Sequence, residues 1–223
     1  YLKYLFIVIP GSIAGEYLHE WLHYKNTMPV NDNKDERKRM PWILLLTIGL
    51  IVFNLYGLYM RYLLLNLAGT IAILCILYIL LQVEGKNTSY WYKLFRAGTY
   101  LILLGLAFEA YEGGIRKDPS TYSYYFLASG LAFMAMIAFS IMCDIYSWSR
   151  LTRPLEYAGQ NPMIAYVSTQ LVVLPLLNLA GLGTYLSYLD QNAWLGFLRG
   201  VIVTSLALLI TILFTKLKCF WRT

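Results

Sequence analysis

Charged residues are scarce in this chain: Asp, Glu, Lys and Arg make up 13% of its 223 residues, whereas apolar types make up 59%. Together with a mean hydropathy of +0.55, this composition excludes a soluble globular domain. Cysteine is scarce too, and Cys75, Cys143 and Cys219 lack the spacing of a metal site, so we assign them to packing. No Ser/Gly-rich linker or repeat divides the chain, which predicts one membrane domain over residues 1–223.

The long apolar runs predict helices, because a bilayer core about 30 Å thick takes roughly 20 helical residues but only about ten residues of a barrel strand. We expect an all-α polytopic transmembrane helix bundle. The run 41–83 must fold back, near Arg61, since one helix of that length would reach about 65 Å. The bundle then has about seven spans, at Leu2–Leu22, Trp42–Tyr59, Tyr62–Val83, Trp91–Glu112, Tyr122–Trp148, Leu155–Leu179 and Trp194–Leu217.

The distribution of Lys and Arg predicts the orientation, because cytoplasmic loops retain positive charge. With alternating loops, five of the 18 basic residues fall on one side, and the remaining thirteen fall on the other; the five are Lys3, Arg61, Arg116, Lys117 and Arg199. This places the C-terminus in the cytoplasm. The net charge of +6 then reflects topology and contact with anionic lipid, and the cations are too dispersed for nucleic acid.

The segment His19-Glu20-Trp-Leu-His23 has the H-E-x-x-H pattern of zinc metalloproteases, in which two histidines on one helix face hold the metal and the Glu activates water. A third ligand is not near in sequence, and the segment lies where the first helix leaves the membrane. We therefore favour an interfacial helix end without a metal, and an intramembrane zinc protease is the least favoured function.

Other polar or helix-breaking residues lie within the predicted spans. Pro10-Gly11 interrupts the first helix, which is tolerated only where neighbours or a cavity satisfy the freed carbonyl. A lined cavity and close packing of the small residues up to Gly15 explain this pattern equally well. Asn54 and Asn66 flank the expected turn at Arg61, and we expect them to form an interhelical hydrogen bond.

A charged segment follows the fourth span, where Glu109 and Glu112 lie one helical turn apart and precede Arg116, Lys117 and Asp118. An ionisable residue within a span is by default a functional candidate, because its burial is costly without a partner. Arg116 is the natural partner for either carboxylate. These five residues, with tyrosines nearby, suit the binding of a sugar or another polar acceptor. A helix end with a glycine cap and surface ion pairs is the alternative.

A second polar segment precedes the sixth apolar run. Asn161 followed by proline predicts a helix start, with residues 155–159 as a short interfacial or re-entrant stretch. Helix N-termini bind phosphate, and Arg150 and Arg153 are close in sequence. We therefore expect Arg150, Arg153, Gln160 and Asn161 to bind the nucleotide end of an anionic cofactor. An Asn-Pro kink satisfied by neighbouring helices is the alternative.

Three segments carry a resemblance to a known family: Ile9–Gly15, Glu112–Tyr124 and Gly159–Tyr166. In this order they resemble the C-terminal half of bacterial membrane proteins related to heparan-alpha-glucosaminide N-acetyltransferase, in the transmembrane acyltransferase superfamily. The chain does not open with Met, and its first residues lack the features of a signal peptide. We therefore expect the C-terminal part of a longer protein of the bacterial inner membrane.

The resemblance implies an enzyme that takes acetyl from cytoplasmic acetyl-CoA and delivers it to an amino sugar or other glycan acceptor across the membrane. The family's catalytic His belongs to an early span that has no match here, so the catalytic residues are unknown and the chain alone should be inactive. Glu109 and Glu112 would orient or assist the acceptor. Asn161, with Gln160 and Pro162, is the part of the chain that matches a family motif.

The expected partners are membrane lipid, the missing N-terminal half of the same protein and a glycan-like acceptor, with acetyl-CoA as co-substrate and no metal. A homodimer is left open. A transporter or flippase for a small polar solute is the competing function, because carriers also combine broken helices, polar groups at membrane depth and charged mouths.

Overall fold

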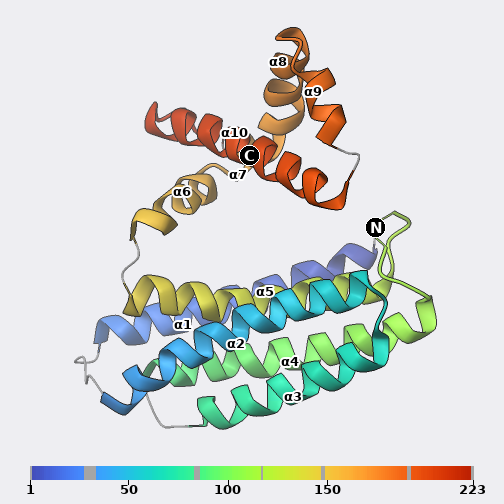
Figure 1. Ribbon diagram of the computed structural model, residues 1–223. Helices are drawn as coiled ribbons and strands as arrows, with labels where there is room; N and C mark the ends of the chain where they lie inside the picture. Colours follow the sequence, from blue (N-terminus) through green and yellow to red (C-terminus); the bar gives the residue numbers. More distant parts are fainter. Residues whose placement is uncertain are drawn as a thin grey trace. The chain divides into compact units, whose positions relative to one another are not determined.

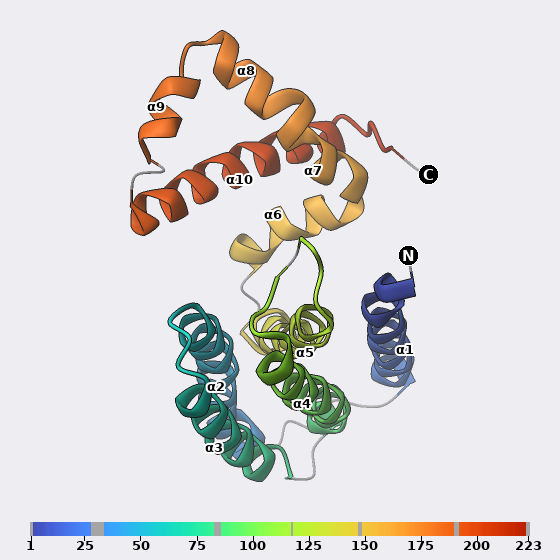
Figure 2. The same cartoon turned by 90° about the vertical axis from the view of Figure 1, so that its right-hand side faces the viewer.

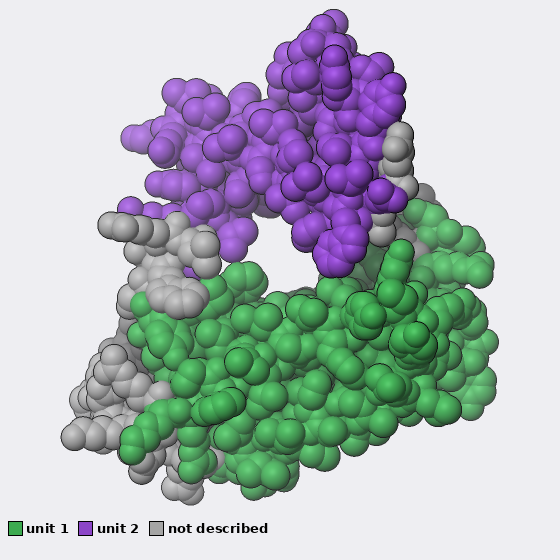
Figure 3. All heavy atoms as spheres, in the orientation of Figure 1, with its two compact units in different colours: residues 1–147 green, residues 148–223 purple. Residues whose placement is uncertain are grey.

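The computed structural model describes residues 2–27, 34–82, 86–116, 118–146, 149–189 and 192–221. Within these ranges the chain forms helices and no strand (Figure 1). It divides into two compact units, residues 1–147 and 148–223, which are described separately below (Figure 3). The boundary between the units falls where the sequence shows no linker.

The first unit contains five long helices: α1 (Leu5–Thr27), α2 (Lys34–Tyr59), α3 (Leu63–Leu81), α4 (Lys86–Glu112) and α5 (Tyr122–Ser140). A 3₁₀ turn precedes α1, and α5 continues into a π-helical turn over Ile141–Ile145. The second unit contains α6 (Ser149–Gln160), α7 (Pro162–Ser168), a π-helical turn (Thr169–Val173), α8 (Leu174–Leu179), α9 (Gly183–Tyr188) and α10 (Ala193–Lys216).

The structure confirms the all-α polytopic architecture, since six stretches of the described chain are helical, long and apolar enough to cross a membrane. Their ends lie close to the predicted ones for five of the predicted spans. The sixth stretch begins at Pro162 rather than at Leu155, because the preceding residues form α6, a separate amphipathic helix. The six are Lys38–Tyr59, Leu63–Leu81, Ser89–Glu112, Tyr122–Ile145, Pro162–Leu179 and Trp194–Lys216.

The predicted first span is helical but is not among the six. Helix α1 begins with an apolar run, whereas its second half carries Glu16, His19, Glu20 and His23. These polar side chains lower the hydropathy of the helix as a whole. The count of about seven spans is therefore reduced to six among the described residues, and α1 is a helix of mixed character that packs against α4 and α5.

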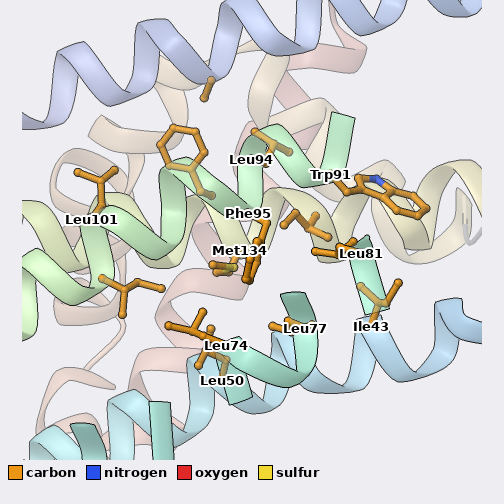
Figure 4. Close-up of a cluster of buried hydrophobic side chains, with 14 of the residues drawn as sticks. Ile43, Leu50, Leu74, Leu77, Leu81, Trp91, Leu94, Phe95, Leu101 and Met134 are labelled. Atoms are coloured by element: carbon orange, nitrogen blue, oxygen red, sulfur yellow. The ribbon is translucent and has the colours of Figure 1, made fainter. Parts of the chain in front are cut away.

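Helices α4 and α5 form the closest contact in the first unit, with α2 and α3 on one side and α1 on the other (Figure 2). Glycines permit this approach. A Cβ atom added at Gly105 would lie 2.8 Å from the backbone nitrogen of Leu127, and one added at Gly130 would lie 2.8 Å from that of Ile102. Apolar side chains of α2, α3, α4 and α5 then meet in one core around Leu77 (Figure 4).

The chain reverses direction between α2 and α3 at Arg61, as predicted. The N–H of Tyr62 donates to the carbonyl of Gly57 and that of Arg61 to Leu58, which is the hydrogen-bond pattern of a Schellman motif. Arg61 occupies the left-handed position of this motif, with φ of 58°, where glycine is the usual residue. An arginine at this position carries a backbone cost that glycine would avoid, and Lys218 after α10 has the same conformation, with φ of 57°.

Polar side chains join α2 to α3 below this turn. The amide of Asn66 donates to Oδ1 of Asn54 over 3.2 Å, and the hydroxyl of Thr70 donates to the same oxygen over 3.2 Å. All three residues are fully buried. The predicted interhelical hydrogen bond between the two asparagines is confirmed, and it replaces the water that a bilayer does not supply.

Pro10 removes the N–H group that would bond to the carbonyl of Phe6 within α1. That carbonyl accepts a hydrogen bond from the hydroxyl of Ser129 in α5, over 3.3 Å. Gly11 and Gly15 have open space where a Cβ atom would stand, so they do not bring the helices into close contact. Of the two explanations left open by the sequence, the structure favours the cavity.

In the second unit, α6 ends at Gln160 and α7 begins at Pro162, as the Asn-Pro pair predicts. The side chain of Asn161 does not cap α7. Its amide donates to the carbonyl of Cys219 over 2.8 Å, and its Oδ1 accepts the N–H of Trp221 over 3.3 Å. Asn161 thus holds the segment after α10 against the junction of α6 and α7.

The glycine contact between α4 and α5 predicts a stability difference. Gly105→Ala should lower the free energy of unfolding by about 1–3 kcal/mol, because the new methyl group meets the backbone of Leu127. Gly49→Ala, in open space on α2, should be neutral or stabilising by up to about 1 kcal/mol. Denaturant unfolding in mixed micelles measures both, and equal effects of the two changes would show that the contact is not a close one.

Candidate functional site

A cavity of about 440 Å³ lies at the end of the first unit where α2 meets α3 and α4 meets α5. Glu109 on α4, Arg61 in the α2–α3 turn and Tyr124 on α5 contribute polar groups to its lining, among apolar side chains such as Leu127. A concave, mostly apolar site with a few convergent polar groups is the usual form of a small-ligand site. We therefore take this cavity, named here the polar cavity, as the candidate site.

Glu109 is the buried charge of the polar cavity, with 4% of its surface exposed. Its Oε1 lies 3.8 Å from Nη2 of Arg61, which is the separation of a loose ion pair rather than of a hydrogen bond. From the sequence we expected Arg116 to be the ion-pair partner of Glu109, and this prediction was wrong, because the partner is Arg61. The chain reversal at Arg61 brings a cation from 48 positions away in sequence.

Arg61 is positioned by the loop after α4 as well as by its own turn. Its Nη2 donates to the carbonyl of Gly113 over 2.7 Å, and a Cβ atom at Gly114 would lie 3.3 Å from the same nitrogen. Its side chain is nevertheless 58% exposed. A guanidinium group has five N–H donors, so this exposed side chain can bind a further acceptor at the cavity.

Glu112 does not line the polar cavity. Its two carboxylate oxygens accept the backbone N–H groups of Tyr122 and Ser123, each over 2.9 Å. These are the first N–H groups of α5, which have no partner within the helix. Glu112 therefore caps α5 from the end of α4, a role that the sequence did not reveal because the cap and the helix start are ten residues apart.

The other predicted acceptor residues follow α4. Arg116 lines the polar cavity and is exposed, while its backbone N–H and carbonyl bond to the hydroxyl of Thr121. Asp118 is exposed and is not part of the lining. Lys117 lies outside the described residues. The structure therefore brings together Glu109 and Arg116 of the predicted set and adds Arg61.

A second cavity of about 430 Å³, named here the apolar cavity, lies between α1 and α5. Pro10, Gly11 and Gly15 line it from α1, and Ala132 and Met136 from α5. Its polar lining is limited to Ser129, whose hydroxyl bonds to the Phe6 carbonyl.

The residues predicted to bind an anionic cofactor lie in the second unit. Arg153 and Gln160 are exposed on α6, and the amide of Gln160 approaches Glu156 at 3.5 Å. The side chain of Arg150 is outside the described part of the structure. Asn161 is fully buried, with both polar atoms of its side chain bonded to backbone groups near the C-terminus. Cofactor binding by these four residues stays a prediction.

The H-E-x-x-H segment lies on α1, and its Glu20 forms an ion pair with Lys93 on α4, with 2.6 Å between Oε2 and Nζ. Among the described residues no group of three or more His, Cys, Asp or Glu side chains comes close enough to hold a metal ion. The carboxylate that would activate water in a protease is thus engaged in joining two helices.

Sequence reasoning missed Arg61 and Tyr124 as residues of the candidate site. A signal for Arg61 was present, since it is the one charged residue in the long apolar run 41–83 and lies on the same predicted side as Arg116. Tyr124 was noted only as one of several tyrosines near the charged segment. What the sequence could not supply is which side of α5 faces the α2–α3 turn.

Comparisons with known proteins returned no match: no family model matches the chain, and no curated protein or solved structure is significantly similar to it.

The capping role of Glu112 predicts a loss of stability. Glu112→Ala should lower the free energy of unfolding by about 1–3 kcal/mol, because two N–H groups of α5 lose their acceptor. Glu112→Gln, which retains one acceptor oxygen, should lose less. Glu16→Ala, at an exposed glutamate of α1, serves as the control and should have little effect. Denaturant unfolding in mixed micelles measures the free energy of unfolding of the three variants. An equal loss of stability in all three would contradict the capping role.

Proposed function

We propose that this chain is part of a membrane acyltransferase, in which the polar cavity binds the acceptor of an acetyl group supplied by acetyl-CoA. The observation that carries the proposal is the buried carboxylate of Glu109 beside an exposed guanidinium in a cavity at the end of the spans. The resemblance of three segments to acetyltransferases of the heparan-alpha-glucosaminide type supports the same reaction.

The chemistry of the polar cavity suits an amino or hydroxyl acceptor. Acetyl transfer requires that the attacking nitrogen or oxygen lose a proton as its bond to the acetyl carbon forms and the bond to the CoA sulfur breaks. A carboxylate that accepts a hydrogen bond from the acceptor can orient it for this attack. Glu109 is the candidate for this role, because its ion pair with Arg61 is long and leaves carboxylate lone pairs for a ligand.

The cofactor side of the proposal rests on the second unit. Helix α6 is amphipathic and presents Arg153 and Gln160 at its exposed surface. Arginine side chains bind phosphate through charge-assisted hydrogen bonds, which suits the nucleotide end of acetyl-CoA. The burial of Asn161 against the C-terminal segment suggests that it shapes this region rather than touching the cofactor. A general base elsewhere in the protein would complete the reaction.

A carrier for a small polar solute is the second candidate. Pro10 removes one backbone hydrogen bond within α1 beside the apolar cavity, and helices with freed backbone groups next to cavities are shared with transporters. The two functions differ in their need for acetyl-CoA. A transferase consumes acetyl-CoA in proportion to acceptor, whereas a carrier moves its solute without it.

The acceptor role of Glu109 predicts a loss of catalysis without a loss of cofactor affinity. In the full-length protein, Glu109→Gln should lower acetyl transfer to an amino sugar by about 100-fold, because an amide in place of the carboxylate holds the acceptor in a different position for attack. Acetyl-CoA binding should be unchanged. Glu16→Gln is the control and should retain the parental rate. Full transfer by Glu109→Gln would contradict the role, and solute uptake without acetyl-CoA would favour the carrier.

The cofactor role of α6 predicts a loss of affinity for acetyl-CoA. Replacing Arg150 and Arg153 together with Gln should weaken acetyl-CoA binding by about tenfold or more, and binding by the parent protein should fall with rising salt. Arg199→Gln, on α10 of the same unit, is the matched control for lost positive charge. Calorimetry on the purified protein measures the affinities. Equal binding by the double variant and its parent would remove α6 from the cofactor site.

A further inference from the structure

The polar and the apolar cavity share a wall. Helix α5 contributes Tyr124, Leu127 and Ala128 to the polar cavity, and Ala128, Ala132 and Met136 to the apolar cavity. With 3.6 residues per turn, these two sets lie on adjacent faces of the helix, and Ala128 belongs to both. The cavities are therefore neighbours along one helix, and the residue between them carries only a methyl group.

The apolar cavity extends away from the polar end of the spans. From Ala128 to Met136 the helix rises about 12 Å, towards the middle of the span Tyr122–Ile145. The α1 side of the cavity is open, because nothing lies within 4 Å of a Cβ atom placed at Gly11 or Gly15. Its interior offers no unbonded hydroxyl, since that of Ser129 bonds to the Phe6 carbonyl. Such a space at this depth suits a hydrocarbon chain.

The polar cavity has an excess of positive charge at its mouth. Arg61 and Arg116 line it and are exposed, whereas its lining contributes one carboxylate, that of the buried Glu109 beside Arg61. Arg61 occupies a left-handed turn position that glycine would fill without strain, so its side chain can be removed there without disturbing the turn. Two guanidinium groups at the end of membrane spans suit a phosphate, which they bind through charge-assisted hydrogen bonds.

We propose that the two cavities together bind a phosphate-bearing lipid, with its phosphate at Arg61 and Arg116 and a hydrocarbon chain along α5 between Ala128 and Met136. The ligand then has the orientation of a lipid in a bilayer, with its head at the span ends and its chain towards the midplane. This inference rests on the proposed function, where it makes the acceptor a lipid-linked molecule, such as a sugar carried on a lipid phosphate.

Dodecyl phosphate is the probe, with binding measured by native mass spectrometry of the full-length protein released from a neutral detergent. Dodecyl phosphate should bind, while inorganic phosphate and dodecanol should each bind about tenfold more weakly or worse, because each lacks half of the recognised molecule. Equal binding of dodecanol and dodecyl phosphate would overturn the role of the arginines. Equal binding of inorganic phosphate and dodecyl phosphate would overturn the role of the apolar cavity.

Variants test each cavity separately. Gly11→Leu should fill the apolar cavity and weaken dodecyl phosphate binding by about tenfold or more, and Ala132→Leu does the same from the opposite wall. Gly49→Leu is the matched control, because Gly49 on α2 also has open space around it and lines neither cavity. Unchanged binding in both filled variants, with melting temperatures like that of the control, would overturn the proposal.

Arg61→Gly tests the phosphate side without straining the turn, since glycine is the preferred residue at the left-handed position. Arg116→Gln provides the second change. Each should weaken dodecyl phosphate binding by about tenfold while leaving dodecanol binding unchanged. Equal weakening of both probes would show that the arginines act only on the fold, and it would contradict the assignment of the phosphate.

Two outcomes separate this proposal from the proposed function. If dodecyl phosphate binds as expected but no acetyl is transferred to any acceptor, the lipid site stands and the transferase fails. If a soluble amino sugar is acetylated and dodecyl phosphate does not compete, the transferase stands and the lipid site fails.

If Gly11→Leu instead converts a dimer to a monomer in the mass spectra, the apolar cavity holds a second copy of the chain and the proposal is overturned.

Discussion

The structure depends on the rule that polar groups carried into apolar surroundings must be satisfied by the protein itself. The chain meets this rule largely with bonds between helices, although Oδ1 of Asn66 and Oγ1 of Thr99 are buried without a hydrogen-bond partner among the described residues. Asn66 and Thr70 on α3 both bond to Asn54 on α2, and the hydroxyl of Ser129 bonds to the carbonyl that Pro10 leaves open in α1. These bonds fix how α2, α3, α1 and α5 meet, and the close contact of α4 with α5 completes the first unit.

Glu109 departs from this pattern. Whereas Glu112 makes two short bonds to the start of α5, the Glu109 carboxylate has one side-chain partner among the described residues, Arg61, at 3.8 Å. A buried carboxylate with a loose ion pair is costly to maintain, and ionisable groups in such surroundings cluster at functional sites. The left-handed backbone of Arg61 adds a second cost at the same place. Both point to the polar cavity as the functional part of this unit.

Much of the fold could be predicted from the sequence, because span lengths and helix breaks are local signals. The turn near Arg61, the helix start at Pro162 and the bond between Asn54 and Asn66 follow from such signals, and the structure has all three. The character of α1 was misjudged, since its apolar first half outweighed the polar residues that follow.

The candidate site was predicted less well, because its geometry depends on contacts between distant segments. Arg61 reaches Glu109 only through the α2–α3 reversal, and Glu112 reaches the start of α5 only through the loop after α4. The engagement of Asn161 with the segment after α10 joins residues about 60 positions apart. No local pattern of charge or hydropathy contains these pairings.

The most direct measurement is an experimental structure of the full-length protein with a lipid-linked amino sugar phosphate bound. The account predicts ligand density in the polar cavity, with the amino group within hydrogen-bond distance of the Glu109 carboxylate and the phosphate beside Arg61. Density elsewhere on the protein, or a polar cavity filled by the protein's own side chains with Glu109 and Arg61 in a tight pair, would contradict the account.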